Sequence, residues 1–201
     1  MEFIEDIATL EALYGQPGQA SLRKVARQMT PAYRKWIMAS RFCVLSTVGP
    51  EGTDGSPRGD DGPAVQELDP QTLLLPDWRG NNRIDSLRNI VADSRVSLMF
   101  MVPGSNTVVR VNGTAGVTLD DDLRARFEHA GKRPRAVIVI RIGEIYSQCA
   151  RAVMRAGLWT AGDESAELPS MGDILHEMTQ GAIDGQAYDE EWPGRAAQTM
   201  W

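Results

Sequence analysis

Cysteine and histidine are scarce in this chain. Its 201 residues include two of each, namely Cys43, Cys149, His129 and His176, and these four are widely separated in the sequence. Zinc sites in proteins are built from closely spaced Cys and His ligands, so we expect no metal site here. Two distant cysteines in apolar or helical contexts are expected to be buried free thiols. We expect both histidines, which lie in polar helical stretches, at the surface.

Long apolar runs are also missing. The longest extends from Val96 to Val102 and is interrupted by Ser97, far short of the roughly 20 residues that cross a bilayer. We therefore expect no membrane association, and the acidic stretch Met1 to Asp6, which lacks a leader pattern, favours a cytoplasmic protein. The net charge of −6 argues against a nucleic-acid partner, because such binding depends on phosphate neutralisation.

Each end of the chain lacks charge of one sign. No acid occurs between Glu11 and Glu51, where the basic residues are Arg23, Lys24, Arg27, Arg34, Lys35 and Arg41. No lysine or arginine occurs between Arg155 and Arg195, where the acids are Asp163, Glu164, Glu167, Asp173, Glu177, Asp184, Asp189, Glu190 and Glu191. These runs are either two solvated surfaces or two segments that dock on each other, within one chain or across a dimer.

Strand patterns dominate the middle of the chain. Six segments are rich in β-branched or aromatic residues and are bounded by Gly, Pro or Asp: 42–48, 64–68, 72–75, 96–102, 107–119 and 136–146. Within the fifth, Asn112-Gly113 is compatible with a hairpin turn or with a continuous strand carrying a bulge. Six short strands with few intervening helices predict a mainly β, antiparallel protein with a closed or split barrel.

Helical periodicity is found on both sides of this region and between its strands. The predicted helices are 3–14, 21–40, 82–93, 120–129, 148–158 and 171–179. The second is expected to be interrupted by Pro31 and to restart at Thr30. Length and composition fit one folded core. We divide the chain into an N-terminal helical arm (1–40), a barrel domain (41–160) and an acidic C-terminal tail (161–201) that packs on the barrel or on a dimer partner.

Two segments combine glycines, arginines and helix-starting residues. They are Ser56-Pro57-Arg58-Gly59-Asp60 and Leu75-Pro76-Asp77-Trp78-Arg79-Gly80-Asn81-Asn82-Arg83-Ile84-Asp85-Ser86. If a helix begins at Asn82, Arg83 and Ser86 share its first turn, where backbone N–H groups lack partners and can bind an anion such as phosphate. The competing interpretation is that Asn82 only caps a helix and Arg83 is a surface residue. We expect Asp85 to point away from an anion, toward Arg88.

These blocks also resemble a known family. Five blocks, namely Ser56-Pro57-Arg58-Gly59-Asp60, Leu75-Pro76-Asp77, Gly80-Asn81-Asn82-Arg83-Ile84-Asp85-Ser86, Val109-Arg110-Val111-Asn112-Gly113 and Gln148-Cys149-Ala150-Arg151-Ala152, are similar in content and order to the FMN-binding split-barrel proteins related to pyridoxamine 5'-phosphate oxidase. The similarity extends from about Pro31 to Trp159 and is to a branch whose substrate is not firmly assigned. Five blocks in order are far more specific than any one block.

The resemblance implies a fold and a cofactor. It implies an antiparallel six-stranded split barrel that binds FMN without a covalent bond at a homodimer interface and acts as an oxidoreductase on an unidentified small molecule. The cofactor-binding residues that we carry over are Arg58, Gly59, Asp60, Leu75, Pro76, Asp77, Asn82, Arg83, Ser86, Arg110, Gln148 and Arg151. No catalytic residue is assigned.

Several of these assignments have alternatives. Arg58 and Asp60 would lie beside the ribityl and phosphate groups, or would form a pair that only fixes their loop. Arg110 would neutralise charge on a reduced flavin, or would form a buried ion pair with an aspartate. Many relatives carry a histidine and a lysine where this chain has Gln148 and Arg151, so an imidazole acid–base group is missing there.

Two other functions remain open on the same fold. The protein would be a flavin carrier or sensor without catalysis, or it would bind haem or deazaflavin in place of FMN. Haem is disfavoured because neither histidine lies in a ligand-like context.

Overall fold

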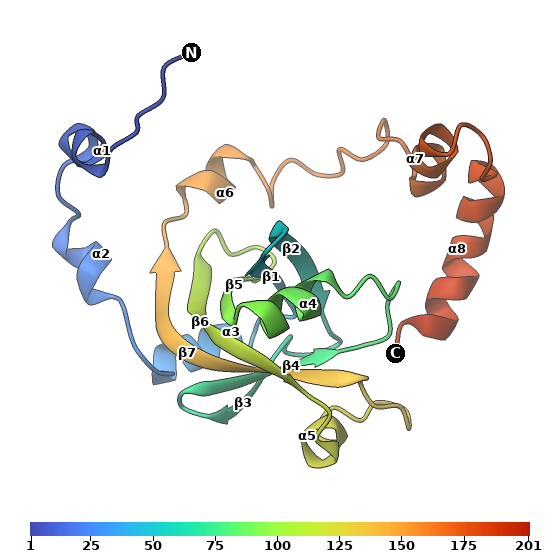
Figure 1. The fold of residues 1–201 in the computed structure, drawn as a ribbon, viewed down its shortest axis with the longest axis horizontal. Coiled ribbons are helices and arrows are strands. Elements are labelled where there is room, and N and C mark those ends of the chain that lie inside the picture. Colours follow the sequence, from blue (N-terminus) through green and yellow to red (C-terminus); the bar gives the residue numbers. More distant parts are fainter.

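One antiparallel sheet of seven strands, coiled into a barrel that does not close, forms the body of the protein (Figure 1). This is seen in a computed structural model that describes residues 1–201. The strands are β1 (Phe42–Gly49), β2 (Gly52–Gly59), β3 (Gln66–Asp69), β4 (Thr72–Asp77), β5 (Arg95–Met101), β6 (Val108–Thr118) and β7 (Ala136–Gln148). Their order in the sheet is β2-β1-β5-β6-β7-β4-β3, so that β2 and β3 are the two edges.

The architecture confirms the mainly β, antiparallel split barrel, but the expected number of six strands is wrong. The additional strand is β2, whose sequence Gly-Thr-Asp-Gly-Ser-Pro-Arg-Gly consists largely of turn-forming residues. It becomes a strand because it pairs with β1 along its whole length, from Gly49 opposite Gly52 to Phe42 opposite Gly59. Pro57, which lacks an N–H group, is tolerated because β2 is an edge strand.

The core lies on the inner face of the sheet. Leu45, Leu98, Val111 and Ile145 form a row across β1, β5, β6 and β7 in which each residue is opposite the next. All four are fully buried. A neighbouring row on the same face contains Cys43, Phe100 and Val109. This alternation of inward apolar residues is what the period of a strand requires, and it explains why these strands could be recognised in the sequence.

Strand β6 runs without interruption through Asn112-Gly113. Its register with β7 shifts between these two residues, so the bulge is present and the hairpin-turn alternative is wrong. A side chain at position 113 would collide with the backbone carbonyl of Arg141 on β7. Glycine is therefore needed here for close backbone approach.

Two helices pack against the sheet, and one of them, α4, reaches the site described below. Helix α3 (Pro31–Ile37) begins at the N-cap Thr30 and buries Ile37 completely. Helix α4 (Asp85–Ala92) packs on β1. Gly49 leaves the space that the Asn89 side chain fills, and the Nδ2 atom of Asn89 donates to Thr47 Oγ1 at 3.1 Å.

Several helix boundaries differ from those expected. The expected restart at Thr30 is confirmed, because Thr30 is the N-cap of α3. The first part of the segment 21–40 is shorter than expected, since α2 (Gln19–Arg23) ends before Ala26, which bridges to Ile145 of the sheet. The helix expected at 82–93 begins only at Asp85, because Asn82 and Ile84 adopt left-handed backbone angles. The helices expected at 120–129 and 148–158 are reduced to α5 (Asp121–Ala125) and α6 (Arg151–Arg155).

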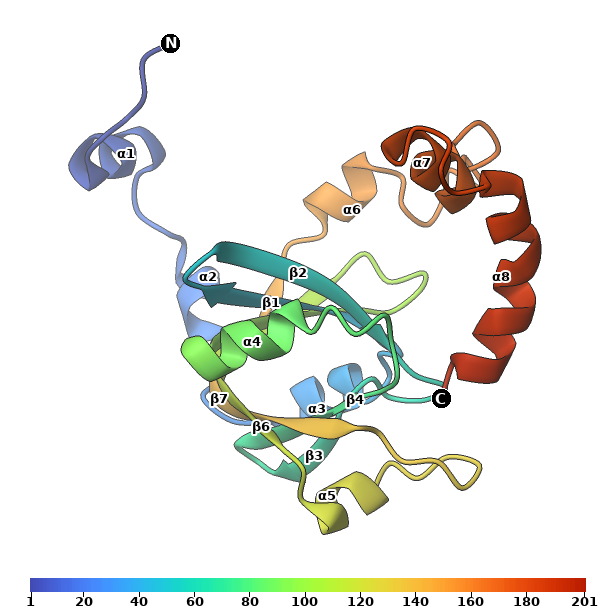
Figure 2. The ribbon, with the colours of Figure 1, turned by 45° about the vertical axis from the view of Figure 1, so that its right-hand side comes forward.

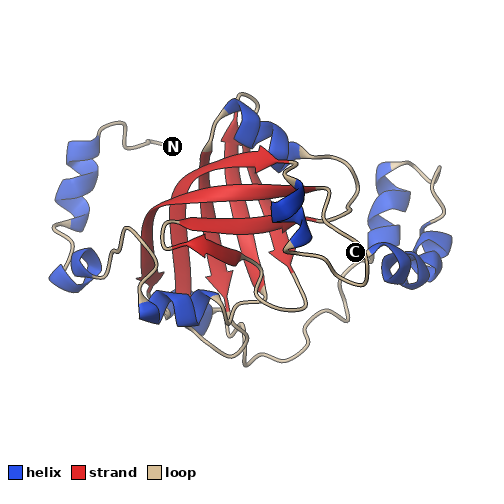
Figure 3. Ribbon diagram, turned by 90° about the horizontal axis from the view of Figure 1, so that it is seen from below, coloured by secondary structure: helices blue, strands red, loops and turns tan.

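The two terminal segments extend from the barrel on opposite sides, and the C-terminus itself returns to lie beside the barrel (Figures 2 and 3). Helix α1 (Ile7–Tyr14), which begins later than the expected Phe3, buries none of its residues. At the other end, α7 (Met171–Met178) matches the expected helix closely, whereas α8 (Gly185–Thr199), which contains Pro193 and Gly194, was not predicted. Because the ends lie apart, the basic and acidic runs do not dock on each other within one chain. No helix combines the length and apolar character that a bilayer-crossing segment needs.

The bulge gives a test of the fold. We expect Gly113→Ala to lower the free energy of unfolding by about 2 kcal/mol or more, because the added methyl group collides with backbone that cannot move aside freely. Gly116→Ala is the matched control, since a Cβ atom at this position on the same strand meets no atom within 4 Å. Urea unfolding of both variants measures the difference, and equal stabilities would show that the β6–β7 contact is not tight.

Candidate functional site

A cavity of about 670 Å³ opens between β2, the end of β4, the loop 78–84 and the first turn of α4. These elements come from separate parts of the sequence and meet where the barrel is open. Eight of the twelve candidate cofactor-binding residues line the cavity: Arg58, Gly59, Leu75, Pro76, Asp77, Asn82, Arg83 and Ser86. The structure thus brings together the two segments that the sequence singled out.

An ion pair crosses the cavity wall. Arg58 Nη1 on β2 donates to Asp77 Oδ1 at the end of β4 at 2.6 Å, and both side chains are largely buried. The pairing of Arg58 with Asp60, which we considered, is therefore wrong. The Nε atom of Arg58 is buried and has no hydrogen-bond partner. A buried donor without a partner is costly, so this atom is available for a ligand acceptor.

The loop before α4 is strained. Asn82 and Ile84 have φ angles of 63° and 52°, which are unfavourable for residues with a Cβ atom and especially for a β-branched one. The Asn82 side chain is held by Arg135, whose Nη1 atom donates to Asn82 Oδ1 at 2.6 Å. Strain of this kind persists only where the surroundings enforce it, and it is concentrated at functional sites.

The strained loop sets the positions of Arg83 and the helix end. No side chain caps the N-terminus of α4, so its first N–H groups remain free for an anion. Arg83 lies before the helix and not in its first turn. Its side chain is 75% exposed, and its Nε atom donates to Asp85 Oδ2 at 3.0 Å. The expectation that Asp85 faces Arg88 is therefore wrong.

Ser86 is buried in the first turn of α4. Its hydroxyl donates to Asp54 Oδ2 on β2 at 2.5 Å. The Ser86 hydroxyl therefore does not donate its proton to a ligand in this arrangement. The contact also fixes the N-terminal end of α4 against the edge strand β2. The backbone N–H of Ser86 is unaffected by this hydrogen bond.

An indole forms another part of the wall. Trp78 Nε1 donates to Asp60 Oδ2 at 3.0 Å, which places Asp60 behind Trp78 and outside the cavity lining. The last residue of the chain, Trp201, packs edge-on against Trp78 at 5.2 Å between ring centroids and also contacts His129. Lys132 Nζ donates to the Trp201 carbonyl oxygen at 3.2 Å. The C-terminus is thus attached beside the cavity.

Some lining residues were not among the sequence candidates. Asp54, Trp78, Arg79, Asn81 and Arg135 all contribute to the wall. Three of these residues, Trp78, Arg79 and Asn81, lie within the glycine- and arginine-containing segment 75–86, so the whole segment, and not only its candidate residues, predicts the cavity wall. Asp54 lies on β2, the strand that the sequence did not predict, and no motif in the sequence around Arg135, just before β7, marks it as a cavity residue.

Three candidates lie away from the cavity in one chain. Arg110 is on the outer face of the sheet, with its guanidinium 5.9 Å from the centroid of the Tyr146 ring. Its Nε atom is buried without a hydrogen-bond partner, and it forms no ion pair within the chain, so the alternative of a structural Arg–Asp pair is wrong. Gln148 and Arg151 are exposed at the end of β7 and the start of α6.

The family model for pyridoxamine 5'-phosphate oxidase matches residues 29–149. The chain belongs to the pyridoxamine 5'-phosphate oxidase family. This match includes all seven strands, α4 and the cavity, whereas most of the N-terminal arm and all of α6, α7 and α8 lie outside it. Among curated proteins, no significant match to the chain was found.

Solved structures with the same type of fold include HupZ of Group A Streptococcus, at 16% identity and a TM-score of 0.50 over 59% of this chain and 93% of HupZ. A second is General Stress Protein 26 of Bacillus anthracis, at 19% identity and a TM-score of 0.41 over 57% and 88% of the two chains. A third is an FMN-binding protein of Syntrophomonas wolfei, at 13% identity and a TM-score of 0.43 over 58% and 88%. At 16% identity the likeness to HupZ concerns the fold alone.

The two cysteines of this pyridoxamine 5'-phosphate oxidase family member differ in environment. Both are free, Cys43 is buried on β1, and Cys149 is exposed, so the expectation that both are buried is wrong for Cys149. Cys149 follows the end of β7, where the chain turns away from the sheet. Burial raises the pKa of the Cys43 thiol to about 12, although the positive charge of Arg58 opposes part of this increase.

We expect one thiol per folded chain to react with Ellman's reagent at pH 8, and two after unfolding. Only a thiolate reacts, and the raised pKa of Cys43 keeps it protonated. Cys149→Ser should abolish the reaction of the folded protein, and two fast-reacting thiols would contradict this burial.

Because the pKa of Cys43 is raised above its unfolded value of about 8.5, the contribution of this thiol to the free energy of unfolding should decline as the pH rises from there toward 12.

Proposed function

We propose that this protein binds FMN in the cavity and is an oxidoreductase that acts on a small molecule, working as a homodimer with the flavin at the subunit interface. The observation that carries the proposal is the buried, unpartnered Nε atom of Arg58 in a cavity that also contains an uncapped helix N-terminus. Membership of the pyridoxamine 5'-phosphate oxidase family and the resemblance of the five sequence blocks to FMN-binding proteins support the choice of cofactor.

The phosphate would be bound at the α4 end of the cavity. Free backbone N–H groups at the start of α4 and the guanidinium of Arg83 both favour an anion there. Asp54 and Asp85 are acidic neighbours, but each already accepts a hydrogen bond, from Ser86 and Arg83 respectively. A bound phosphate would compete with Asp85 for Arg83, whose exposed side chain is free to reorient.

The ring would be bound at the β4 end. Leu75 and Pro76, which are buried, line this end of the cavity, and Arg58 and Asp77 contribute hydrogen-bonding groups beside them. A mainly apolar surface with a few fixed polar groups is what a planar heteroaromatic ring requires. The Arg58–Asp77 ion pair would hold the guanidinium in place, with its Nε–H directed to a ring or ribityl acceptor.

When bound, the flavin would supply hydride and electron transfer, and the protein would position it and its substrate. The titratable side chains that line the cavity are carboxylates and arginines, and neither histidine is among them. Proton transfer at neutral pH would therefore depend on a carboxyl group such as Asp54 or on solvent.

The proposed homodimer rests on the resemblance and on the outer face of the sheet. Phe42 is 38% exposed there, and Val44, Met99 and Met101 are only half-buried on the same face. Arg110 lies beside them with an unpartnered buried Nε atom. A second chain packed on this face would cover the apolar side chains and bring an acceptor to Arg110.

A flavin carrier or sensor is the second candidate function. It is favoured by the lack of an imidazole in the cavity, because a carrier needs no acid–base group. The two functions differ in turnover: an oxidoreductase reoxidises its reduced flavin repeatedly with a small-molecule acceptor, and a carrier does not.

Absorbance of the purified protein tests the cofactor. We expect a flavin spectrum, with FMN released on denaturation, in a ratio of about one per chain. The apoprotein should regain this spectrum when FMN is added. A protein that neither retains nor rebinds FMN at micromolar concentration would contradict the proposal, and a haem or deazaflavin spectrum would identify a different cofactor.

Arg83 and Arg95 provide a matched pair of variants. Each is an exposed arginine paired with an aspartate two residues away, but only Arg83 lines the cavity. We expect Arg83→Ala to weaken FMN binding by about 2 kcal/mol, roughly 30-fold, through loss of a charge-assisted contact to phosphate. Arg95→Ala should leave the affinity nearly unchanged. Fluorescence titration of the apoproteins measures both, and equal affinities would remove Arg83 from the site.

Arg58→Lys tests the other end of the cavity. The lysine keeps a positive charge beside Asp77 but lacks the buried Nε–H donor. We expect a folded protein that binds FMN about tenfold more weakly, since one hydrogen bond to the ligand is lost. Riboflavin affinity, measured in parallel, should fall by a similar factor in this variant and should be almost insensitive to Arg83→Ala.

A further inference from the structure

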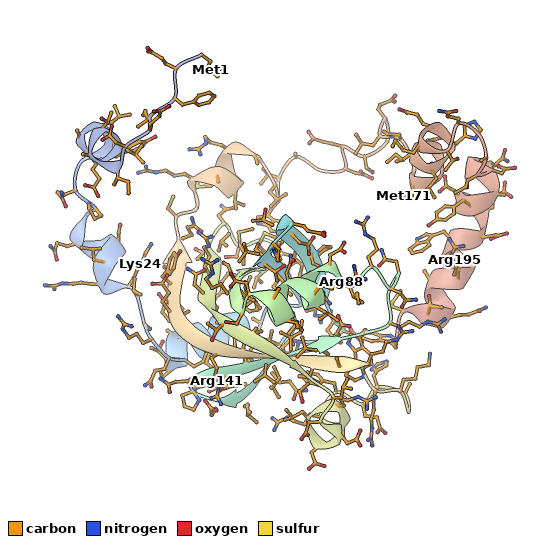
Figure 4. All side chains as sticks on the ribbon, viewed as in Figure 1. Met1, Lys24, Arg88, Arg141, Met171 and Arg195 are labelled. Carbon is orange, nitrogen blue, oxygen red and sulfur yellow. The ribbon has the colours of Figure 1, made fainter.

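A second cavity, of about 460 Å³, adjoins the first at the N-terminal end of α4. It lies between the β1–β2 hairpin, at residues 50–54, and the side of α4 that carries Arg88, Asn89 and Ala92. Figure 4 labels Arg88 on this helix. Because α4 packs on both β1 and β2, the walls of the second cavity are regular elements held in place by the fold.

The two cavities share a junction. Asp54, Arg83 and Asp85 line both of them. In the function proposed above, the FMN phosphate lies at this junction and the flavin ring lies at the far end of the first cavity, beside Leu75 and Pro76. A substrate that reacts with the ring is therefore not bound in the second cavity. A group attached to the outer side of the phosphate would enter it directly, so the second cavity is placed to hold an extension of the cofactor.

Arg88 is the free cation of the second cavity. Asp54, Arg83 and Asp85 form hydrogen bonds within the chain. The side chains of Arg88 and Glu51 are exposed and form neither an ion pair nor a hydrogen bond. Arg88 lies about one helical turn, roughly 5 Å, from the start of α4. A phosphoryl group adjacent to the one at the junction would therefore lie within reach of its guanidinium.

The charge of the second cavity restricts what this extension can be. Glu51, Asp54 and Asp85 outnumber Arg83 and Arg88, so a ligand that adds negative charge is disfavoured. The phosphomonoester of FMN carries about −1.5 to −2 charges at neutral pH. In FAD a similar total is divided between two phosphoryl groups with a single charge on each, so one would face Arg83 and the other Arg88. The remainder of the FAD extension, ribose and adenine, is neutral.

The other residues of the second cavity fit a nucleoside. The hydroxyl groups of a ribose donate to carboxylates, as they do to the acidic residue of dinucleotide-binding folds, and Glu51 has an uncommitted carboxylate in the hairpin turn. Pro50 and Ala92 supply apolar atoms for one face of an adenine ring, and an arginine side chain also stacks on aromatic faces. The volume lies in the range of cavities that bind small ligands.

We propose that the second cavity binds the adenosine monophosphate half of FAD, so that this protein accepts FAD as well as FMN. The inference rests on the proposed function, because it requires the FMN half of the molecule in the first cavity. It makes Arg88 a specificity-determining residue, since this side chain would contact a phosphoryl group that FAD has and FMN lacks. Arg83, in contrast, would contact the phosphoryl group that both flavins share.

Titration of the apoproteins with riboflavin, FMN and FAD, followed by flavin fluorescence, tests the inference. We expect the wild-type protein to bind FAD at least as tightly as FMN. Arg88→Ala should weaken FAD binding about tenfold, through loss of a charge-assisted contact, and should change FMN and riboflavin affinity less than twofold. Arg88→Lys, which keeps the positive charge, should recover most of the FAD affinity.

Two variants serve as controls. Arg95→Ala removes an exposed arginine that lines neither cavity, so it should leave the affinities for FMN and FAD unchanged. Arg83→Ala should weaken the binding of FMN and FAD by a similar factor, because it acts on their common phosphoryl group. Arg88 is exposed on a helix and alanine is the best helix former, so Arg88→Ala should be folded, which thermal unfolding of the apoprotein checks.

Failure of this inference is distinguishable from failure of the proposed function. FAD binding more than tenfold weaker than FMN binding would show that the second cavity excludes the extension. An Arg88→Ala protein whose FMN and FAD affinities change equally, or not at all, would also overturn the inference. Both results would leave FMN binding in the first cavity intact. A wild-type protein that binds none of the three flavins would overturn the proposed function and this inference together.

Discussion

The opening between the two ends of the sheet is the constraint on which the site depends. A closed barrel would pair β2 with a neighbour and leave no room for a ligand, whereas here β2 is an edge. Side chains bridge the opening instead of backbone hydrogen bonds: Arg58 pairs with Asp77, and Trp78 donates to Asp60. These contacts hold β2 near β4 while keeping enough separation for the cavity, so the same residues that stabilise the split also form its wall.

The first turn of α4 is fixed from two directions. Ser86 ties it to Asp54 on the edge strand, and Asn89 ties the helix to Thr47 on β1. The loop that enters the helix must then bridge a short distance, which it does with left-handed angles at Asn82 and Ile84. The free N–H groups that favour an anion are a direct result, because Ile84 occupies the capping position and has no acceptor side chain.

The unsatisfied groups on one chain lie in three places, and together they support the proposed assembly. Arg58 has a free donor in the cavity, Arg110 has one on the outer face of the sheet, and the two terminal segments expose apolar and charged surface at opposite flanks. In the proposed function a ligand would satisfy the first, and a second chain packed on the outer face of the sheet would satisfy the second.

The sequence by itself determined those features that depend on neighbouring residues in the chain, such as strand periodicity and short motifs. Inward rows such as Leu45 and Leu98 follow the period of a strand, and the family blocks predicted that the segments around Arg58 and Arg83 lie close together, as they do around the cavity. The sequence did not predict strand β2, because its glycines and proline favour turns. This segment is a strand only because it pairs with β1. The tertiary structure alone decided that Arg58 faces Asp77 rather than Asp60, that Asp54 and Arg135 reach the cavity, and that the oppositely charged ends lie apart. Each of these depends on contacts between residues far apart in the chain, which local propensity and spacing do not encode.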